Sequence, residues 1–127
     1  PTRGYWTHEA ILYTTADELL ATCADTGNLK IYQNDVGNCW ILPFYRFTFY
    51  NHNATPNNSI PDCVGGWNDS DPVLVNGLFT SRYYHAQGVN TTFADGHVAF
   101  IKNSIETGVW RALGTRNGHE LVSPNAY

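Results

Sequence analysis

The feature that most restricts the fold of this chain is the dipeptide Asp95-Gly96, which lies between two runs of β-forming residues, 89–94 and 97–102. Asp-Gly is typical of the type I′ turn, in which both central residues take positive φ and the flanking strands pair antiparallel. The sequence therefore predicts a tight hairpin in which Ala94 lies opposite His97. In that register, one face of the hairpin carries the side chains expected in the core: Val89, Thr91, Phe93, Val98 and Phe100.

A capping box predicts a helix in the first part of the chain. In Thr15-Ala16-Asp17-Glu18, the Thr15 hydroxyl accepts from the amide of Glu18, whose carboxylate accepts in turn from the amide of Thr15. Apolar residues with helical spacing follow, and Gly27 is a residue that can end a helix in the left-handed region. We expect a short helix over residues 16–24 with one buried face.

The remaining elements indicate an α+β fold that is mainly antiparallel β. A second helix is predicted over residues 105–113, with Ser104 as its cap and Gly114 as its C′ residue. Seven runs of β-branched, aromatic and other apolar residues predict strands at 5–14, 29–32, 40–42, 44–50, 73–78, 80–84 and 121–122. The chain of 127 residues is long enough for one domain, so we expect a single domain over 1–127 with one sheet core and two short helices.

Composition excludes several classes of protein. Charged residues make up only 14% of the chain, its net charge is −4, and its few Lys and Arg are scattered, which is not the footprint of a nucleic-acid-binding protein. No apolar run approaches the length that spans a bilayer. The chain contains no Met and begins at Pro1, so we expect that a preceding segment was removed or is missing.

The residues that carry chemistry form no catalytic or metal-binding motif. The five histidines show no metal-ligand spacing on a predicted helix, and no Gly-x-Ser-x-Gly turn supplies an activated serine. Residues 68–71 (Asn-Asp-Ser-Asp) offer oxygen ligands for calcium but lack the glycine and glutamate of an EF-hand, so turn formation is the favoured interpretation. We therefore expect no enzyme activity and no cofactor.

Cysteines and sequons favour an exported protein. Cys23, Cys39 and Cys63 include no C-x-x-C pair and allow one disulfide in three pairings, with buried thiols in a cytosolic protein as the alternative. The turn-rich stretch over residues 51–72 predicts a long loop that is functional, covered or held by a disulfide. Four Asn-x-Ser/Thr sequons are possible glycosylation sites, namely Asn53, Asn57, Asn68 and Asn90.

The last third of the chain carries a family resemblance. His85, nine further residues and then Asp95-Gly96 form a motif, accompanied by the blocks 88–90 and 110–116. In these residues the chain resembles the prepilin-type processing-associated domain of pseudopilin-like proteins, which are abundant in planctomycete bacteria. Residues 50–63 resemble the middle of the same proteins, and the resemblance as a whole covers roughly residues 23–127.

The resemblance implies a pilin-like globular head outside the membrane, here without the family's apolar N-terminal helix. It implies no catalytic residues, and it makes His85, Asp95 and Gly96 a structural signature. The His85 imidazole is expected to hydrogen-bond the Asp95 carboxylate or a loop carbonyl. Because Cys23 and Cys63 both lie in the part that resembles the family, we predict a Cys23–Cys63 disulfide and a buried thiol at Cys39, which lies outside that bridge.

The leading functional hypothesis is a structural subunit of an extracellular or cell-surface filament whose main partner is a second copy of itself. Residues 1–14 are predicted to form a β-arm that completes a neighbour's sheet, the alternative being an edge strand of the same domain. The alternative function is a carbohydrate-binding or adhesion module, in which exposed aromatic rings stack on sugars and glycans are the partners. The possible assembly contacts on the arm are Tyr5, Trp6, Ile11 and Leu12.

Overall fold

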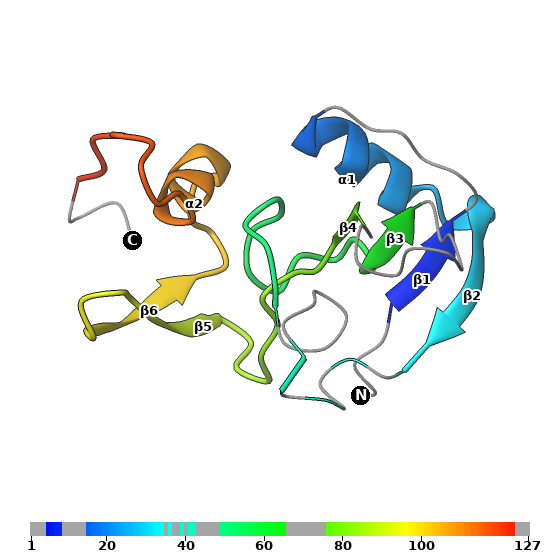
Figure 1. Cartoon of the computed structure of the whole chain (residues 1–127), viewed down its shortest axis with the longest axis horizontal. Helices are drawn as coiled ribbons and strands as arrows, with labels where there is room; N and C mark the ends of the chain where they lie inside the picture. The colour runs from blue at the N-terminus through cyan, green and yellow to red at the C-terminus, as the bar shows by residue number, and fades with distance from the viewer. Residues whose placement is uncertain are drawn as a thin grey trace. The chain divides into compact units, whose positions relative to one another are not determined.

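The computed structural model describes residues 5–8, 15–34, 36, 39, 41–42, 49–65 and 76–123. These residues belong to two compact units (Figure 1). The first unit is drawn from residues 1–51 and 59–79, and the second from residues 52–58 and 80–127. The turn-rich stretch predicted as one long loop therefore contributes to both units.

The first unit contains a four-stranded sheet in the order β2-β1-β3-β4. Its strands are β1 (Tyr5–His8), β2 (Leu29–Gln33), β3 (Cys63–Gly65) and β4 (Asn76–Leu78). The β1–β2 and β3–β4 pairings are antiparallel, whereas β1 and β3 run parallel. The predicted strand over residues 29–32 is confirmed, and Val64 and Phe79 form a buried cluster against which Val36 packs.

The position of β1 contradicts the prediction of a free N-terminal arm. Trp6 pairs with Tyr32 on one side and with Cys63 on the other, and its amide donates to the carbonyl oxygen of Asp62 at 2.9 Å. The backbone of Tyr5 pairs with Gln33. β1 is thus an inner strand of its own sheet, and neither the arm nor the edge-strand alternative describes it. Its partners are far away in sequence, which is why no local pattern revealed them; Ile11 and Leu12 lie outside the described residues.

Helix α1 (Ala16–Ala24) begins and ends where the sequence predicts. Glu18 N donates to the Thr15 hydroxyl at 3.2 Å, and Thr15 N donates to the Glu18 carboxylate at 3.1 Å, which completes the capping box. Leu19 and Cys23 form its buried face. The helix ends at Asp25 and continues into a 3-10 turn, η1 (Thr26–Asn28), so the expectation that Gly27 closes it in the left-handed region is wrong.

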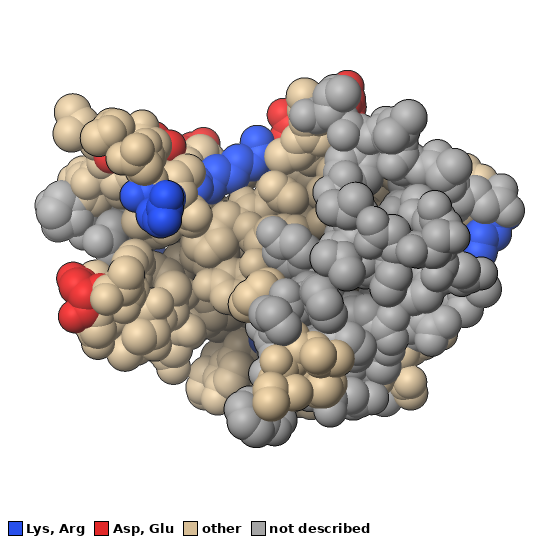
Figure 2. Space-filling model, in the orientation of Figure 1, with Lys and Arg blue, Asp and Glu red and all other residues tan. Residues whose placement is uncertain are grey.

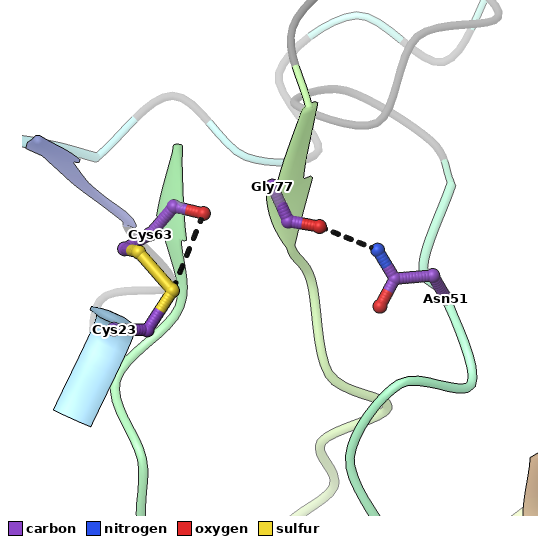
Figure 3. Close-up of a disulfide and its surroundings, with 4 residues drawn as sticks. All are labelled: Cys23, Asn51, Cys63 and Gly77. Atoms are coloured by element: carbon purple, nitrogen blue, oxygen red, sulfur yellow. Dashed lines mark hydrogen bonds between the residues drawn. A yellow bond between two sulfur atoms is a disulfide. The ribbon is translucent and has the colours of Figure 1, made fainter. Parts of the chain in front are cut away.

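The predicted Cys23–Cys63 disulfide joins the end of α1 to β3, and both cysteines are fully buried (Figure 3). The bridge closes a loop with a sequence separation of 40 residues. Beside β4, the Asn51 side-chain amide donates to the Gly77 carbonyl oxygen at 2.7 Å. Cys39 is a free thiol, but it is half-buried and not buried as predicted.

The second unit packs an antiparallel hairpin against a short helix. The hairpin consists of β5 (Gly88–Thr92) and β6 (Val98–Lys102), and the helix is α2 (Thr107–Leu113). Trp110 on α2 is fully buried. It forms the core of this unit together with three further buried residues, Val89, Ile101 and Ile105.

The hairpin exists as predicted, but its register is shifted by one residue. Thr92 lies opposite Val98 and Val89 lies opposite Ile101, with a three-residue loop, 94–96, at the tip. Because side chains alternate along a strand, this shift moves Val98 and Phe100 from the predicted core face to the outer face. Ile101 lies in the core instead.

The start of α2 also differs from the prediction. Its N-cap is Glu106, whose carboxylate accepts from the amide of Val109 at 2.9 Å, whereas Ser104 precedes the helix by three residues. Bonds from the amides of Gly108 and Val109 hold the pKa of Glu106 below its ordinary value. Gly114 is the C-cap residue in the right-handed region, not a left-handed C′ residue.

The α+β class with mainly antiparallel strands and two short helices is confirmed. Residues 80–84, 41–42 and 121–122 are not strands, although the sequence predicts strands there. Instead, Ser81 O accepts from the Asn57 amide, Tyr83 N donates to Asn57 Oδ1, and the Arg82 guanidinium donates to Asn58 O. The predicted strand over 44–50 falls mostly outside the described residues. Among the helices described, none has the length and apolar character needed to cross a bilayer.

Candidate functional site

The Asp95-Gly96 dipeptide, which follows His85 after nine residues, forms the tip of the β5–β6 hairpin. Gly96 N donates to Phe93 O at 2.9 Å and Phe93 N donates to His97 O at 2.9 Å. Gly96 has φ +89°, a conformation that glycine adopts without strain. Asp95 does not have positive φ, which excludes the predicted type I′ turn. A three-residue loop that ends in a left-handed glycine is the next most common hairpin connection.

Asp95 stabilises this turn through His97. Its carboxylate oxygen Oδ1 accepts from the His97 amide at 3.1 Å and lies 2.6 Å from His97 Nδ1. These bonds hold the pKa of Asp95 below its ordinary value. The His97 ring stacks on Phe93 with centroids 4.3 Å apart. The expected His85–Asp95 hydrogen bond is wrong, because the nearer imidazole of His97 takes that place.

His85 lies in a bend three residues before β5, and its side chain is exposed. Its ring is 4.7 Å from that of Tyr83. Its carbonyl oxygen accepts from the side-chain amide of Asn57 at 3.3 Å. The motif histidine therefore stands at the entrance to the hairpin, at the opposite end from the Asp95-Gly96 turn.

Asn57 joins this entrance to the loop. Its Nδ2 lies within hydrogen-bonding distance of Asn103 Oδ1 (2.9 Å), His85 O (3.3 Å) and Gly88 O (3.4 Å). Its Oδ1 accepts from the amide of Tyr83 at 2.7 Å. One side chain thus connects four backbone or side-chain groups of the second unit.

Asn57 was predicted as a sequon and as part of the family-like middle of the chain, but not in this bonding role. A usable signal was present: in Thr55-Pro56-Asn57-Asn58, proline at the second position and asparagine at the third are typical of a type II turn. The structure has that turn, with Asn57 at φ +53° and Asn58 N donating to Thr55 O at 3.2 Å. Asparagine tolerates the left-handed region better than most residues.

Trp110 holds the same loop from the side of the helix. Its indole Nε1 donates to Ala54 O at 2.7 Å, and its ring stacks on His52 with centroids 3.9 Å apart and an interplanar angle of 12°. His52 Nδ1 lies 2.7 Å from Trp110 O. Burial lowers the pKa of His52, and the bond to the Trp110 carbonyl opposes this effect in part. The Arg111 guanidinium donates to Asn53 O at 3.2 Å and 3.3 Å.

An open recess lies beside the motif histidine, with a volume of about 400 Å³. It is lined by residues of the β5 entrance and of the outer face of the hairpin: His85, Ala86, Gln87, Asn90 and Phe100. Asn90 and Phe100 are directly opposite each other in the β5–β6 register. Among the described residues that line the recess there is no carboxylate, lysine or arginine.

The four sequons have different surroundings. Asn90 is exposed on β5 and Asn53 is half-buried, whereas Asn68 lies outside the described residues. At Asn57, a sugar on Nδ2 would displace the bonds to three acceptors. Among the three sequons that the structure describes, Asn90 is the one whose side chain is exposed.

Within the described part of the chain, no group of three or more His, Cys, Asp or Glu side chains could hold a metal ion. Comparison with protein-family models, with curated protein sequences and with solved structures found no match to this chain.

Proposed function

We propose that this chain is an exported, pilin-like structural subunit that assembles with copies of itself into an extracellular or cell-surface filament. The observation that carries the proposal is the outer face of the β5–β6 hairpin, which we define by Val98 and Phe100. Val98 is 62% exposed and Phe100 is 44% exposed, and both lie on the side of β6 opposite to the buried Ile101.

Burial of this outer face by a second copy would be favourable. Covering an exposed valine or phenylalanine fully is worth roughly 1.5–3 kcal/mol for each side chain. A contact between the outer face of one copy and a different surface of the next is heterologous, and heterologous contacts that do not close into a ring produce filaments. The outer face is thus suited to a repeated contact.

Three other features support a structural role outside the cytosol. The buried Cys23–Cys63 disulfide is typical of proteins that fold in an oxidising compartment. The Asp95 carboxylate bonds within its own turn, which is a structural use of a motif residue. On the side of the molecule drawn in Figure 2, few of the described side chains are charged.

The experiment is electron microscopy and sedimentation of the protein and of a Val98→Glu variant. The variant should stay monomeric under conditions in which the parent forms ordered fibres, because a carboxylate would be buried in the contact. Leu121→Glu is the matched control, since Leu121 is a fully exposed apolar residue away from the hairpin, and this variant should assemble normally. A parent protein that remains a monomer at high concentration would contradict the proposal.

A further inference from the structure

We propose that the recess beside His85 is a binding site for a neutral saccharide. This inference goes beyond the assembly function and concerns a copy whose outer face is uncovered, because Phe100 belongs both to that face and to the recess. The recess is defined above by His85, Ala86, Gln87, Asn90 and Phe100. Its volume of about 400 Å³ falls within the range of small-molecule sites, roughly 300–1,000 Å³.

The lining has the two kinds of group that a sugar ring needs. Phe100 offers a partly exposed aromatic ring, on which the apolar C–H face of a pyranose stacks. The side-chain amides of Gln87 and Asn90 each carry a donor and an acceptor, so each matches a hydroxyl group, which also donates and accepts. The described residues of the lining contribute no carboxylate, lysine or arginine, which fits an uncharged ligand.

Gly88 leaves the space that the Phe100 ring occupies at the wall of the recess. Gly88 begins β5, and a Cβ at this position would lie 2.8 Å from Phe100 Cζ and 2.2 Å from Ile101 O. Any other residue would therefore push the Phe100 ring away and disturb the strand pairing. Position 88 leaves room for Phe100 at the wall of the recess.

The backbone beneath the polar wall is held in place before any ligand binds. His85 O accepts from Asn57 Nδ2, Ala86 O accepts from Asn103 Nδ2 at 2.9 Å, and Gln87 O accepts from Asn103 N at 2.9 Å. All three consecutive carbonyl groups are thus bonded to asparagines, while the three side chains are exposed. Preorganisation of this kind reduces the entropy lost on binding.

The test is a titration of the ¹⁵N-labelled protein at a concentration at which sedimentation shows it to be monomeric, followed by the chemical shifts of its backbone amides. The probes are cellobiose and N,N′-diacetylchitobiose as neutral disaccharides, and glucuronic acid as a charged comparison. The protein must carry no sugar on Asn90, which an intact mass equal to that of the polypeptide establishes. At least one neutral disaccharide should give saturable shifts in the millimolar range, confined to residues 85–90 and 100.

Two variants should remove the binding, and two matched variants should retain it. Gln87→Ala and Phe100→Ala should each weaken it by about tenfold or more. Asn117→Ala removes an exposed amide away from the recess, and Tyr32→Ala removes an exposed aromatic ring in the first unit, so both should bind as the parent does. The pattern of shifts across the spectrum shows whether each variant is folded.

Several outcomes would overturn the proposal. They are the absence of saturable shifts with both neutral probes, shifts that centre on other residues, and stronger binding of glucuronic acid than of the neutral probes. Val98→Glu should bind sugar as the parent does, and Gln87→Ala should assemble as the parent does. A failure of saccharide binding is therefore distinguishable from a failure of filament assembly.

Discussion

The two units hold pieces of one loop by different physical means. In the first unit, the end of the loop enters β3, where Cys63 is bonded covalently to α1. In the second unit, residues 52–58 are held without a covalent link, by the Asn57 side-chain amide and by contacts with Trp110. A disulfide and a set of hydrogen bonds thus hold two parts of the chain that lie within 12 residues of sequence.

Because the two units are held differently, each should lose stability under different conditions. A disulfide acts chiefly on the unfolded chain by reducing its entropy, so it is sensitive to reduction and insensitive to pH. Hydrogen bonds and ring stacking stabilise the folded state. They are lost when a substitution removes the donor or acceptor, or when protonation changes the charge of a ring. The following predictions separate the two units by these sensitivities.

The largest effect is expected from Trp110→Ala, at about 3–5 kcal/mol of the free energy of unfolding of the second unit. The substitution empties the core and leaves Ala54 O without its donor. Amide hydrogen exchange should accelerate in β5, β6 and residues 52–58. Trp110→Phe keeps an aromatic ring and should lose less. Equal acceleration in β1 to β4 would mean that the units unfold together.

Removal of the disulfide should have the next largest effect, confined to the first unit. For a loop of this length the chain-entropy model gives a loss of roughly 3–4 kcal/mol. Cys23→Ser with Cys63→Ser removes the bond without leaving a reactive thiol from the pair. Exchange should accelerate in α1 and β3, and reductant should reproduce the effect in the parent. A double variant as stable as the parent would show that the covalent link contributes nothing.

Substitution of Asn57 should weaken the second unit by an intermediate amount. Asn57→Gly keeps the positive φ and loses the side-chain bonds, which should cost about 1–3 kcal/mol. Asn57→Ala should cost about 1 kcal/mol more, because alanine is strained in the left-handed region. Both are measured by urea unfolding. A Gly variant with unchanged stability would show that solvent replaces the four bonds without loss.

What the sequence predicted well depended on local signals. The start of α1 follows from a capping box in which Thr15 and Glu18 are three residues apart. The pairing of Cys23 with Cys63 came from the family resemblance, not from local spacing, and the structure contains it. The inner position of β1 was missed because Tyr5 and Trp6 pair with strands that begin at residues 29 and 63. Hydrophobic pattern gives no information about such distant partners.

The hairpin was predicted correctly as an element, but the face of β6 that it buries was predicted wrongly. A two-residue and a three-residue loop at Asp95-Gly96 differ by one residue in register, and the choice exchanges the two faces of β6. The sequence-based core contained Val98 and Phe100, whereas the structure buries Ile101 and exposes both of them. The recess beside Phe100 was therefore invisible to the sequence, although three of its residues, His85, Asn90 and Phe100, had been singled out for other reasons.

The smallest effect is a pH dependence of the second unit that arises from His52. Burial holds the pKa of His52 below its ordinary value of 6.5, so the folded state favours the neutral ring. As the pH falls below this value, the unfolded chain takes up a proton before the folded one does. The contribution of His52 is therefore fully present above about pH 6.5 and is lost as the pH falls through the lower pKa of the folded state.

This pH dependence should be absent from the first unit and removable from the second by one substitution. In the parent, hydrogen exchange in β5 and β6, corrected for its intrinsic rate, should become faster between about pH 7 and about pH 5, whereas β3 should change little. His52→Phe preserves a ring that can stack on Trp110 but cannot titrate, so its profile should be flatter. His119→Gln, which removes an exposed histidine, should keep the profile of the parent.

An identical slope in the parent and in His52→Phe would assign the pH dependence to another group. Since His52 is only half-buried, water shares in stabilising its charge, which is why this effect ranks below the loss of Trp110, of the disulfide or of Asn57.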